Sequence, residues 1–505
     1  MLPSLEVFLA HAREGNIVPV YTQVMADLET PVSAYLKLAR GRRLSFLLES
    51  VEGGEKIGRY TYLGTDPFLV VKARGDRIEM TSREGTARRR GNVFDVLRET
   101  ARQFRPAGQQ GLPPFSAGAV GYAGYELVRL IEPRVPAFRK DDLRVPDAVL
   151  LFFSTVLAFD HVKHQIWIIA NVRCDAWKGN LEKGYRAAVA EVAAIEKRLS
   201  GPLARQKRRG GREAPSSPRS NISRQGFLRA VEKAKDYILA GDIFQVVLSQ
   251  RLDLSLHAEP FQVYRALRTV NPSPYMFYLR LEDQVVLGSS PEMLVKVEGR
   301  QVEYRPIAGT HPRGSSEAED REIERRLLAD EKERAEHIML VDLGRNDLGR
   351  VCEFGSVKVK DLMILERYSH VIHIVSSISG RLREGADAFD ALAACFPAGT
   401  VSGAPKVRAM EIIAELEPTR RGVYAGSVLY LDFSGNLNSC ISIRTMTVRG
   451  RRAHIQVGAG IVADSSPERE YRETMSKGEA LLRAVELASK GTGRRAGGSY
   501  YGAGD

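Results

Sequence analysis

The sequence predicts a strand-rich fold, in which series of strands alternate with a small number of amphipathic helices. Strand-like stretches follow one another over roughly the first 170 residues, among them 147–161 (DAVLLFFSTVLAFDH) and 165–173 (QIWIIANVR). Stretches rich in β-branched and aromatic residues, separated by turn signals, are typical of strands. Helical periodicity is confined to segments such as 179–199 and about 317–342.

The chain divides into two predicted domains joined by a linker. Residues 200–222 (SGPLARQKRRGGREAPSSPRSN) are rich in Gly, Pro, Ser and Arg and lack periodicity, as expected of a flexible linker. Residues 1–199 form the predicted N-terminal domain, and residues 223–489 form the second, which begins with Ser223 as a helix cap. Residues 490–505 are expected to be a disordered tail.

The composition is that of an ordinary globular protein, with 44% apolar and 27% charged residues and no apolar run long enough to span a membrane. The four cysteines lack CxxC spacing, which argues against a zinc site and for a reducing, cytoplasmic environment. The net charge of +12 raises the question of nucleic-acid binding. The excess arginines lie in segments such as 88–90 and 205–212, without interleaved aromatic residues, so solvated loops are favoured over a nucleic-acid surface.

Residues 458–477 (GAGIVADSSPEREYRETMSK) combine a predicted glycine turn with a helix start. Ser465 or Ser466 can cap the helix, and Pro467 suits its first turn; if Ser465 is the cap, Glu468 completes a capping box. The opening GAGIVA matches part of a dinucleotide-binding fingerprint, but that fingerprint requires a helix to begin within the turn, and here the helix begins too late. The turn can instead offer backbone N–H groups to a carboxylate.

Glu470, Glu473 and Lys477 share one face of this predicted helix, because they are spaced at i, i+3 and i+7. Two interpretations remain open at this point. The first is a solvated helix face with a Glu–Lys pair. The second is half of a Mg²⁺ site, because a hard divalent ion prefers carboxylate oxygens.

Glu336 is a carboxylate set into a predicted apolar stripe. Met339, Leu340 and Leu343 follow it on the same helical face, and Ala329 precedes it by seven residues. A buried carboxylate needs a partner. The helix alone leaves a structural ion pair and a functional role equally open.

Several long motifs together resemble the chorismate-utilising enzyme family. These are DEKERAEHIMLVDLGRND, PAGTVSGAPK and the E-x-x-E-T-x-x-K pattern of the last helix, in the family's order. The resemblance runs from about Phe8 to Leu487, and within the family it is closest to the anthranilate synthase large subunits (component I). It implies an α+β fold, a sandwich of antiparallel sheets with helices packed outside. The implied reaction converts chorismate and ammonia to anthranilate and pyruvate, with Mg²⁺, as the first committed step of tryptophan biosynthesis.

The resemblance also implies roles for individual residues. Glu336 and Glu473 would bind Mg²⁺, which would grip the ring carboxylate of chorismate, with Glu470 contacting the ion directly or through water. Glu292 would be the general acid that protonates the departing ring hydroxyl, a role that needs a carboxyl group kept protonated by burial. His373 would act in or near the elimination of pyruvate.

The remaining implied site residues surround the substrate. The resemblance implies a catalytic role for Thr400. It also implies that Tyr424, Arg444 and Lys477, together with the glycine turn, would hold the enolpyruvyl carboxylate. The implied substrate-binding set is Gln245, Gly309, Thr310, Tyr424, Arg444, Gly458, Ala459, Gly460 and Lys477.

Two positions distinguish the chain from relatives in the family. Relatives that use water carry a lysine base at the position of Gln245, whereas neutral ammonia is already a nucleophile, so glutamine suits an ammonia-using enzyme. Many aminodeoxychorismate synthases read PIKGT where this chain has Ala308, and alanine cannot add covalently to the ring. Anthranilate is therefore the expected product, with aminodeoxychorismate synthase component I as the alternative. His311 replaces the family's usual arginine.

The motifs LLES and NPSPYMF resemble the tryptophan feedback site of this family. Glu49 and Ser50 would bind the polar groups of tryptophan, and Pro274, Tyr275 and Met276 would line its indole pocket. Inhibition would follow if tryptophan binds better to a state with a poorly formed active site.

No segment resembles a glutamine amidotransferase with a nucleophilic cysteine. The resemblance therefore implies that ammonia from glutamine comes from a separate amidotransferase subunit, component II, in a hetero-oligomer. No nucleic-acid or membrane partner is expected.

Overall fold

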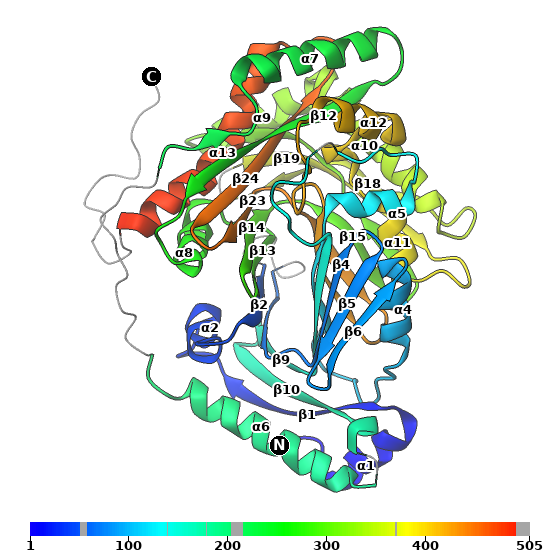
Figure 1. Cartoon of the computed structure of the whole chain (residues 1–505), viewed down its shortest axis with the longest axis vertical. Helices are drawn as coiled ribbons and strands as arrows, with labels where there is room; N and C mark the ends of the chain where they lie inside the picture. Colours follow the sequence, from blue (N-terminus) through cyan, green and yellow to red (C-terminus); the bar gives the residue numbers. More distant parts are fainter. Residues whose placement is uncertain (51–57, 139, 178, 204–215, 369–370, 491–505) are drawn as a thin grey trace.

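The computed structural model describes residues 1–50, 58–138, 140–177, 179–203, 216–368 and 371–490. Two large antiparallel sheets pack face to face, and helices cover their outer sides (Figure 1). The predicted α+β sandwich is therefore confirmed. Residues 204–215 of the predicted linker and 491–505 of the predicted tail lie outside the described residues.

The first sheet joins strands from both parts of the sequence. Its order is β1-β10-β9-β3-β2-β13-β14-β23-β24-β12-β11, and β20 also pairs with β12. Leu48 of β2 pairs with Phe277 of β13, so backbone hydrogen bonds connect residues before and after the predicted linker. The strands are β1 (Ile17–Met25), β2 (Leu44–Glu49), β3 (Tyr60–Thr65), β9 (Thr155–Asp160), β10 (Gln165–Arg173), β11 (Arg219–Ser220), β12 (Gln245–Ser255), β13 (Tyr275–Leu281), β14 (Gln284–Ser290), β20 (Gly403–Ala404), β23 (Thr445–Arg449) and β24 (Arg452–Ile461).

The second sheet is built in the same mixed way. Its order is β17-β19-β16-β15-β22-β21-β7-β8-β4-β5-β6, and β18 also pairs with β19. Here the junction lies between β7 and β21, where Tyr122 pairs with Val428. The strands are β4 (Leu69–Arg74), β5 (Arg77–Ser82), β6 (Gly85–Arg90), β7 (Gly118–Ala123), β8 (Ala148–Phe153), β15 (Met293–Glu298), β16 (Gln301–Tyr304), β17 (Ile307–Pro312), β18 (Lys358–Arg367), β19 (Val371–Arg381), β21 (Ser427–Asp432) and β22 (Leu437–Ile441).

Apolar clusters hold the layers together. Between the sheets, Phe46, Phe153 and Phe277 belong to one fully buried cluster. Helices α1, α2, α6, α8 and α13 pack on the outer face of the first sheet, with α7 and α12 against β12 and β24, whereas α4, α9, α10 and α11 cover the second sheet. The helices are α1 (Leu5–Glu14), α2 (Pro31–Leu38), α4 (Val93–Arg102), α5 (Val128–Ile131), α6 (Leu181–Leu199), α7 (Arg224–Leu239), α8 (Pro260–Val270), α9 (Glu317–Ala329), α10 (Glu331–Gly349), α11 (Ala388–Cys395), α12 (Lys406–Leu416) and α13 (Pro467–Lys490), with 3-10 turns η1 (Tyr125–Leu127), η2 (Cys174–Trp177) and η3 (Gly399–Val401).

Helix caps refine the predicted boundaries. Ser223 caps α7 as predicted, accepting a hydrogen bond from the Gly226 N–H. The predicted long helix at 317–342 is wrong as one element: it breaks at Asp330, whose carboxylate accepts the N–H groups of Lys332 and Glu333 and so starts a second helix. Ala329 therefore belongs to α9 and not to the stripe around Glu336.

At the start of α13, the capping box based on Ser465 does not form. Its hydroxyl accepts from the Val462 N–H at 3.1 Å, and the helix begins one residue after Ser466.

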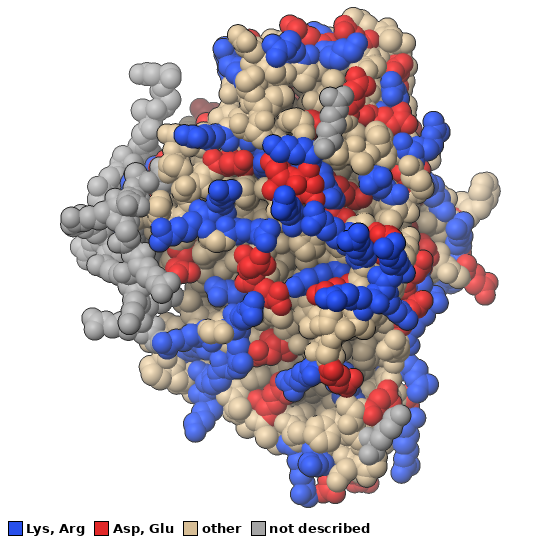
Figure 2. Space-filling view, viewed as in Figure 1, with Lys and Arg blue, Asp and Glu red and all other residues tan. Residues whose placement is uncertain are grey.

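The arginines at 88–90 do not lie in a loop, as the sequence suggested, but on β6, an edge strand of the second sheet. Arg88, Arg89 and Arg90 are exposed and pair with Glu79, Glu99 and Asp76, respectively. Figure 2 shows acidic and basic side chains interspersed over one face of the molecule. Charged residues on an edge strand oppose strand addition by another chain. No helix among the described residues is both long and apolar enough to cross a membrane.

Candidate active site

The predicted site residues from distant parts of the sequence meet where α10 and α13 approach β24 and β12. We call this group the catalytic cluster. It comprises Gln245, Glu292, Gly309, Glu336, His373, Thr400, Tyr424, Arg444, Gly458, Gly460, Glu470, Glu473 and Lys477, and the contacts below connect them. The predicted Thr310 is placed beside this cluster by its backbone alone, because its side chain lies outside the described part of the structure.

The side-chain amide of Gln245 reaches the carboxylate of Glu336. Gln245 begins β12, and its Nε2 lies 3.3 Å from Oε1 of Glu336 on α10. Strand β24 runs antiparallel to β12, and a Cβ on Gly460 would lie only 2.6 Å from the same Nε2. Glycine at 460 therefore leaves the space that the amide occupies.

A phenol and an ammonium group converge on Gly458. A Cβ at this position would lie 2.5 Å from the Tyr424 hydroxyl, so the ring tip lies directly against the strand. Nζ of Lys477 donates to the Gly458 carbonyl oxygen at 3.0 Å and lies 2.6 Å from a Glu473 carboxylate oxygen. Burial raises the pKa of Tyr424 to about 12, so its hydroxyl remains a hydrogen-bond donor at neutral pH.

The predicted glycine turn at 458–460 is wrong, because these residues continue strand β24 and pair with β12 up to Ile461. The pairs between β23 and β24 end at Met446 and Ile455, so beyond that point this edge of β24 is not paired with β23. Lys477 reaches the Gly458 carbonyl there. Residues 458–460 thus form part of a strand with an edge that β23 leaves open, where a loop was predicted. The side chain of Ala459 lies in an apolar cluster with α7 and α12.

Arg444 lies between β22 and β23 in the left-handed region of backbone conformation, with φ of 49°. A non-glycine residue held there marks stored strain, which is concentrated at functional sites. Its Nη1 donates to the Lys477 carbonyl oxygen at 3.1 Å. Burial lowers the pKa of the guanidinium, and Tyr424 and Glu473 act in the opposite direction. Arg444 and Lys477 thus place two cations beside the Tyr424 hydroxyl.

Glu292 is a buried carboxyl group with little around it that would stabilise its charged form. It immediately precedes β15 and is 5% exposed. Burial raises the pKa of its carboxyl to about 8, and the nearby Thr400 hydroxyl, although it forms no hydrogen bond within the described part of the chain, offsets only part of that rise. Among the described residues, Oε1 of Glu292 and Oγ1 of Thr400 are buried without a hydrogen-bond partner. A carboxyl group in this environment is protonated at neutral pH and can give its proton to a bound molecule.

His373 lies on β19, where it pairs in register with Thr310 of β17. Burial lowers the pKa of its imidazole, while the Gly309 backbone and Glu366 oppose that shift. Its ring also contacts Tyr368 edge-on, with 5.5 Å between centroids. The imidazole is thus kept neutral within the cluster.

The sequence did not single out Glu333, which lies one turn before Glu336. A Cβ on Gly309 would lie 3.1 Å from Oε2 of Glu333. Burial raises the pKa of Glu333, and the charges of Glu336 and Glu473 raise it further. The i, i+3 spacing on α10 was the signal that could have identified it.

The carboxylates of α10 and α13 match the ligand chemistry of Mg²⁺. Glu336 and Glu473 influence the same neighbouring carboxyl group, and buried Glu470 has its pKa raised by burial and by Glu473. Among the described residues, no three His, Cys, Asp or Glu side chains lie close enough to hold a metal by themselves. Mg²⁺ usually takes one or two protein carboxylates and completes its shell with substrate oxygens and water. The donor set fits an ion shared with a substrate.

A family model described as chorismate binding enzyme matches residues 45–483. The chain belongs to the chorismate-binding enzyme family.

Relatives within the chorismate-binding enzymes cover nearly the whole chain. It is 49% identical to anthranilate synthase component 1 of Synechocystis sp. over 96% of this chain and 99% of the relative. It is 48% identical to the protein of the same name from Acetivibrio thermocellus, over 97% and 99%. The crystal structure of anthranilate synthase component I from Streptococcus pneumoniae superposes with a TM-score of 0.77 at 34% identity, covering 91% of this chain and 99% of that one.

A cavity of about 640 Å³ lies between the two sheets of this chorismate-binding enzyme; we call it the inter-sheet cavity. All five residues of the predicted tryptophan site line it: Glu49, Ser50, Pro274, Tyr275 and Met276. They meet because β2 and β13 are neighbours, with Glu49 paired in register with Met276.

Within the inter-sheet cavity, Glu49 is anchored from one side. The Tyr264 hydroxyl donates to its Oε2 at 2.5 Å, and Nε of Arg268 lies 2.9 Å from the same oxygen. Burial raises the pKa of Glu49, and these two partners partly offset the rise. The buried hydroxyl of Ser50 has no hydrogen-bond partner among the described residues.

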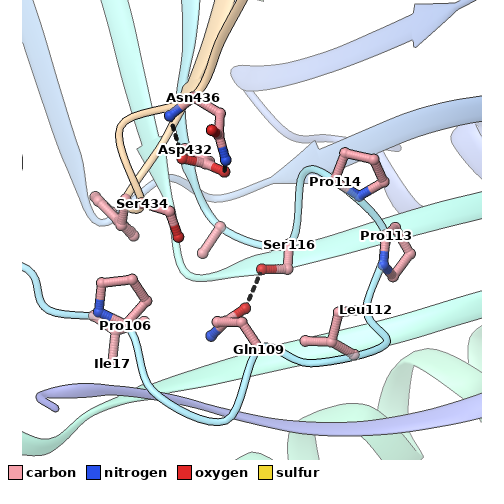
Figure 3. A pocket seen from close by; sticks show the side chains of 12 residues that line it. Ile17, Pro106, Gln109, Leu112, Pro113, Pro114, Ser116, Asp432, Ser434 and Asn436 are labelled. Atoms are coloured by element: carbon pink, nitrogen blue, oxygen red, sulfur yellow. Dashed lines mark hydrogen bonds between the residues drawn. The ribbon is translucent and has the colours of Figure 1, made fainter. Parts of the chain in front are cut away.

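A smaller cavity of about 180 Å³ lies between the 106–117 loop and the β21–β22 hairpin (Figure 3). Its polar groups are used locally: Asp432 accepts the backbone and side-chain N–H groups of Asn436, and the Ser116 hydroxyl donates to Gln109. No residue of the predicted site lines it.

Proposed function

We propose that the chain is the large subunit of an anthranilate synthase, which converts chorismate and ammonia to anthranilate, pyruvate and water. The observation that carries this proposal is the meeting of Gln245, Glu292 and the two-helix carboxylates in one cluster. Relatives named anthranilate synthase component 1 at 44–49% identity support the same assignment.

Glu292 supplies the proton in the first step. Ammonia attacks the ring carbon next to the carboxyl-bearing carbon, the C–N bond forms, and the ring hydroxyl leaves as water after taking the Glu292 proton. Its pKa of about 8 leaves it protonated at neutral pH. Gln245 lacks a basic amine, which suits a nucleophile that needs no deprotonation, and it helps to orient the reacting face through its contact with Glu336.

Tyr424, Arg444 and Lys477 hold the enolpyruvyl carboxylate at the open edge of β24. Hydrogen bonds and positive charge at this end keep the side chain of the substrate aligned for the second step. In that step the ring carbon that carries the new nitrogen loses its proton, and the ring C–O bond to the enolpyruvyl oxygen breaks. The departing enolate takes up a proton at its methylene carbon, which gives an aromatic ring and pyruvate. His373 is the buried imidazole of the cluster available to handle the ring proton.

Glu336 and Glu473, with Glu470 directly or through water, would hold Mg²⁺. When bound, the ion would neutralise the ring carboxylate and draw electron density from the ring.

Tryptophan is the proposed inhibitor at the inter-sheet cavity, with its ammonium group on Glu49 and its indole beside Pro274 and Met276. The proposed ammonia source is a glutamine amidotransferase subunit, component II; the name component 1 of the relatives supports the presence of a further component.

The test is incubation of the purified chain with chorismate, MgCl₂ and ammonium sulfate at a pH of about 8, with anthranilate followed by fluorescence and pyruvate by a coupled dehydrogenase. Both products are expected with ammonium and neither with glutamine alone. Absence of anthranilate would falsify the assignment. An aminated product without pyruvate would identify the aminodeoxychorismate synthase alternative, against which Ala308 argues.

A further inference from the structure

Arg421 is a fully buried cation that touches the catalytic cluster from behind. It lies in the turn between α12 and β21 and is 1% exposed. Burial of a guanidinium group is strongly unfavourable unless its N–H groups are paired. Such a group is stable in the interior only if its partners offset the cost of removing its charge from water. The partners of Arg421 therefore show which parts of the chain it holds in place.

The guanidinium group joins three segments of chain. Nε and Nη2 form a two-point ion pair with Glu417, at 2.9 and 2.6 Å. Nη1 donates to the Val401 carbonyl oxygen and Nη2 to the Val247 carbonyl oxygen, both at 2.7 Å. Val401 follows the predicted catalytic Thr400 directly. Every nitrogen of the fork is therefore used, and two of the acceptors belong to segments that carry site residues.

The Arg421 guanidinium group also packs against the aromatic ring of Tyr424. Its central carbon lies 5.5 Å from the centre of the Tyr424 ring and 4.7 Å from that of Tyr125. The turn is fixed by Glu126, whose carboxylate accepts the N–H of Arg421 at 2.9 Å and that of Gly422 at 3.1 Å. Guanidinium contact with an aromatic face is attractive and directional. The ring that reaches Gly458 is thus held by the cation that holds the Thr400 turn.

Glu417 extends the connection to β12 and β24. Its Oε1 accepts both the backbone N–H and the hydroxyl of Ser249, each at 2.8 Å, and the Ser249 hydroxyl accepts from Gln456 on the neighbouring strand at 2.8 Å. The network therefore holds together the two strands that carry Gln245 and Gly458.

We propose that Arg421, paired with Glu417, is a positioning residue that sets the Thr400 turn, the Gln245 end of β12 and the Tyr424 ring in one arrangement for chorismate. The inference rests on the proposed function, because those three groups are the ones that would contact the substrate. Lysine cannot replace arginine here, since one ammonium group lacks the planar fork that meets a carboxylate and two carbonyl oxygens together.

The test compares Arg421→Lys with Arg251→Lys. Arg251 is a matched control, because it is also a buried arginine, lies on β12 together with Gln245, and pairs with Asp142 and Asp253, neither of which belongs to the catalytic cluster. For each variant the folded fraction at the assay temperature is measured by circular dichroism. Then kcat and KM with ammonium are measured, together with the Kd for chorismate by calorimetry.

Arg421→Lys is expected to lower kcat/KM for chorismate about 100-fold and to raise the Kd at least roughly tenfold, since misplacement by about 1 Å can have such an effect. Arg251→Lys is expected to stay within about threefold of the parent chain at equal folded fraction. Values within about threefold for Arg421→Lys, or an equal loss for Arg251→Lys, would overturn the proposal.

If Arg421→Lys does not fold, Glu417→Gln carries the same test, because it keeps the shape of the partner and removes its charge; unchanged kcat/KM and Kd in that variant contradict the proposal. If the parent chain binds chorismate but forms no anthranilate, the proposed function fails while the Kd comparison still decides the role of Arg421. A parent chain that does not bind chorismate overturns both.

Discussion

Two buried glutamates show how differently the catalytic cluster and the inter-sheet cavity are built. Glu292 and Glu49 each lie next to a strand end, each is 5% exposed, and burial raises the pKa of both. Glu49 has a cation and a phenol as partners, whereas within the described part of the chain the Thr400 hydroxyl alone lowers the pKa of Glu292. A buried carboxyl without a cation is a proton donor, and one beside Arg268 is an anchored group suited to an ammonium ligand.

The largest difference between the two regions is expected from removing each carboxyl in turn. Glu292→Gln should lower kcat for anthranilate formation about 1,000-fold, because general acid catalysis is lost while the shape of the side chain is kept. The Kd for chorismate, measured by calorimetry, should change little. Glu49→Gln is the matched control and should keep the uninhibited rate; an equal loss in both variants would contradict the separation of roles.

The second expected effect concerns the carboxylates of the cluster. Glu336→Gln should raise the Mg²⁺ concentration needed for half-maximal activity about 10- to 100-fold. Calorimetric titration of Mg²⁺ in the presence of chorismate should show the same weakening without relying on turnover. Glu331→Gln, an exposed position at the start of the same helix, is the control. An unchanged Mg²⁺ dependence in Glu336→Gln would remove this residue from the ion site.

The inter-sheet cavity gives the third effect. Glu49→Gln should raise the tryptophan concentration that halves activity about 30-fold, because the ligand loses its charged partner. The measurement is inhibition of ammonium-dependent activity, with direct tryptophan binding by calorimetry. Tryptophan inhibition as strong as that of the parent chain would show that the cavity is not the regulatory site.

The smallest expected effect is a change in the pH dependence of kcat/KM. The pKa of Glu292 is raised to about 8, so its acid form predominates below that pH and declines above it. At constant free ammonia, kcat/KM should fall about tenfold for each pH unit above that value. The profile should be the same in Glu49→Gln and should lose this limb in Glu292→Gln. A limb that persists in Glu292→Gln would assign the titration to another group.

Local chemistry and family motifs determined much of this protein from sequence alone. Strand-like runs predicted the sheets, Ser223 marked a helix start, and the motif residues predicted which side chains would gather. The pattern could not predict that Asp330 would divide a helix, because its side chain competes with the preceding turn for the same N–H groups. Nor could it distinguish a glycine turn at 458–460 from a strand, since small residues suit both.

Long-range contacts were decided only by the tertiary structure. The residue pattern of β24 does not reveal that its pairing with β23 ends early and leaves an open edge beside Lys477. That pairing depends on the length and register of a separate strand. The partners of a buried charge are equally invisible in sequence. Arg421 pairs with Glu417, four residues away in the sequence, but also with carbonyl groups 20 and 174 residues distant. The sequence determined which groups could do chemistry, and the packing of the two sheets and their helices decided which of them meet.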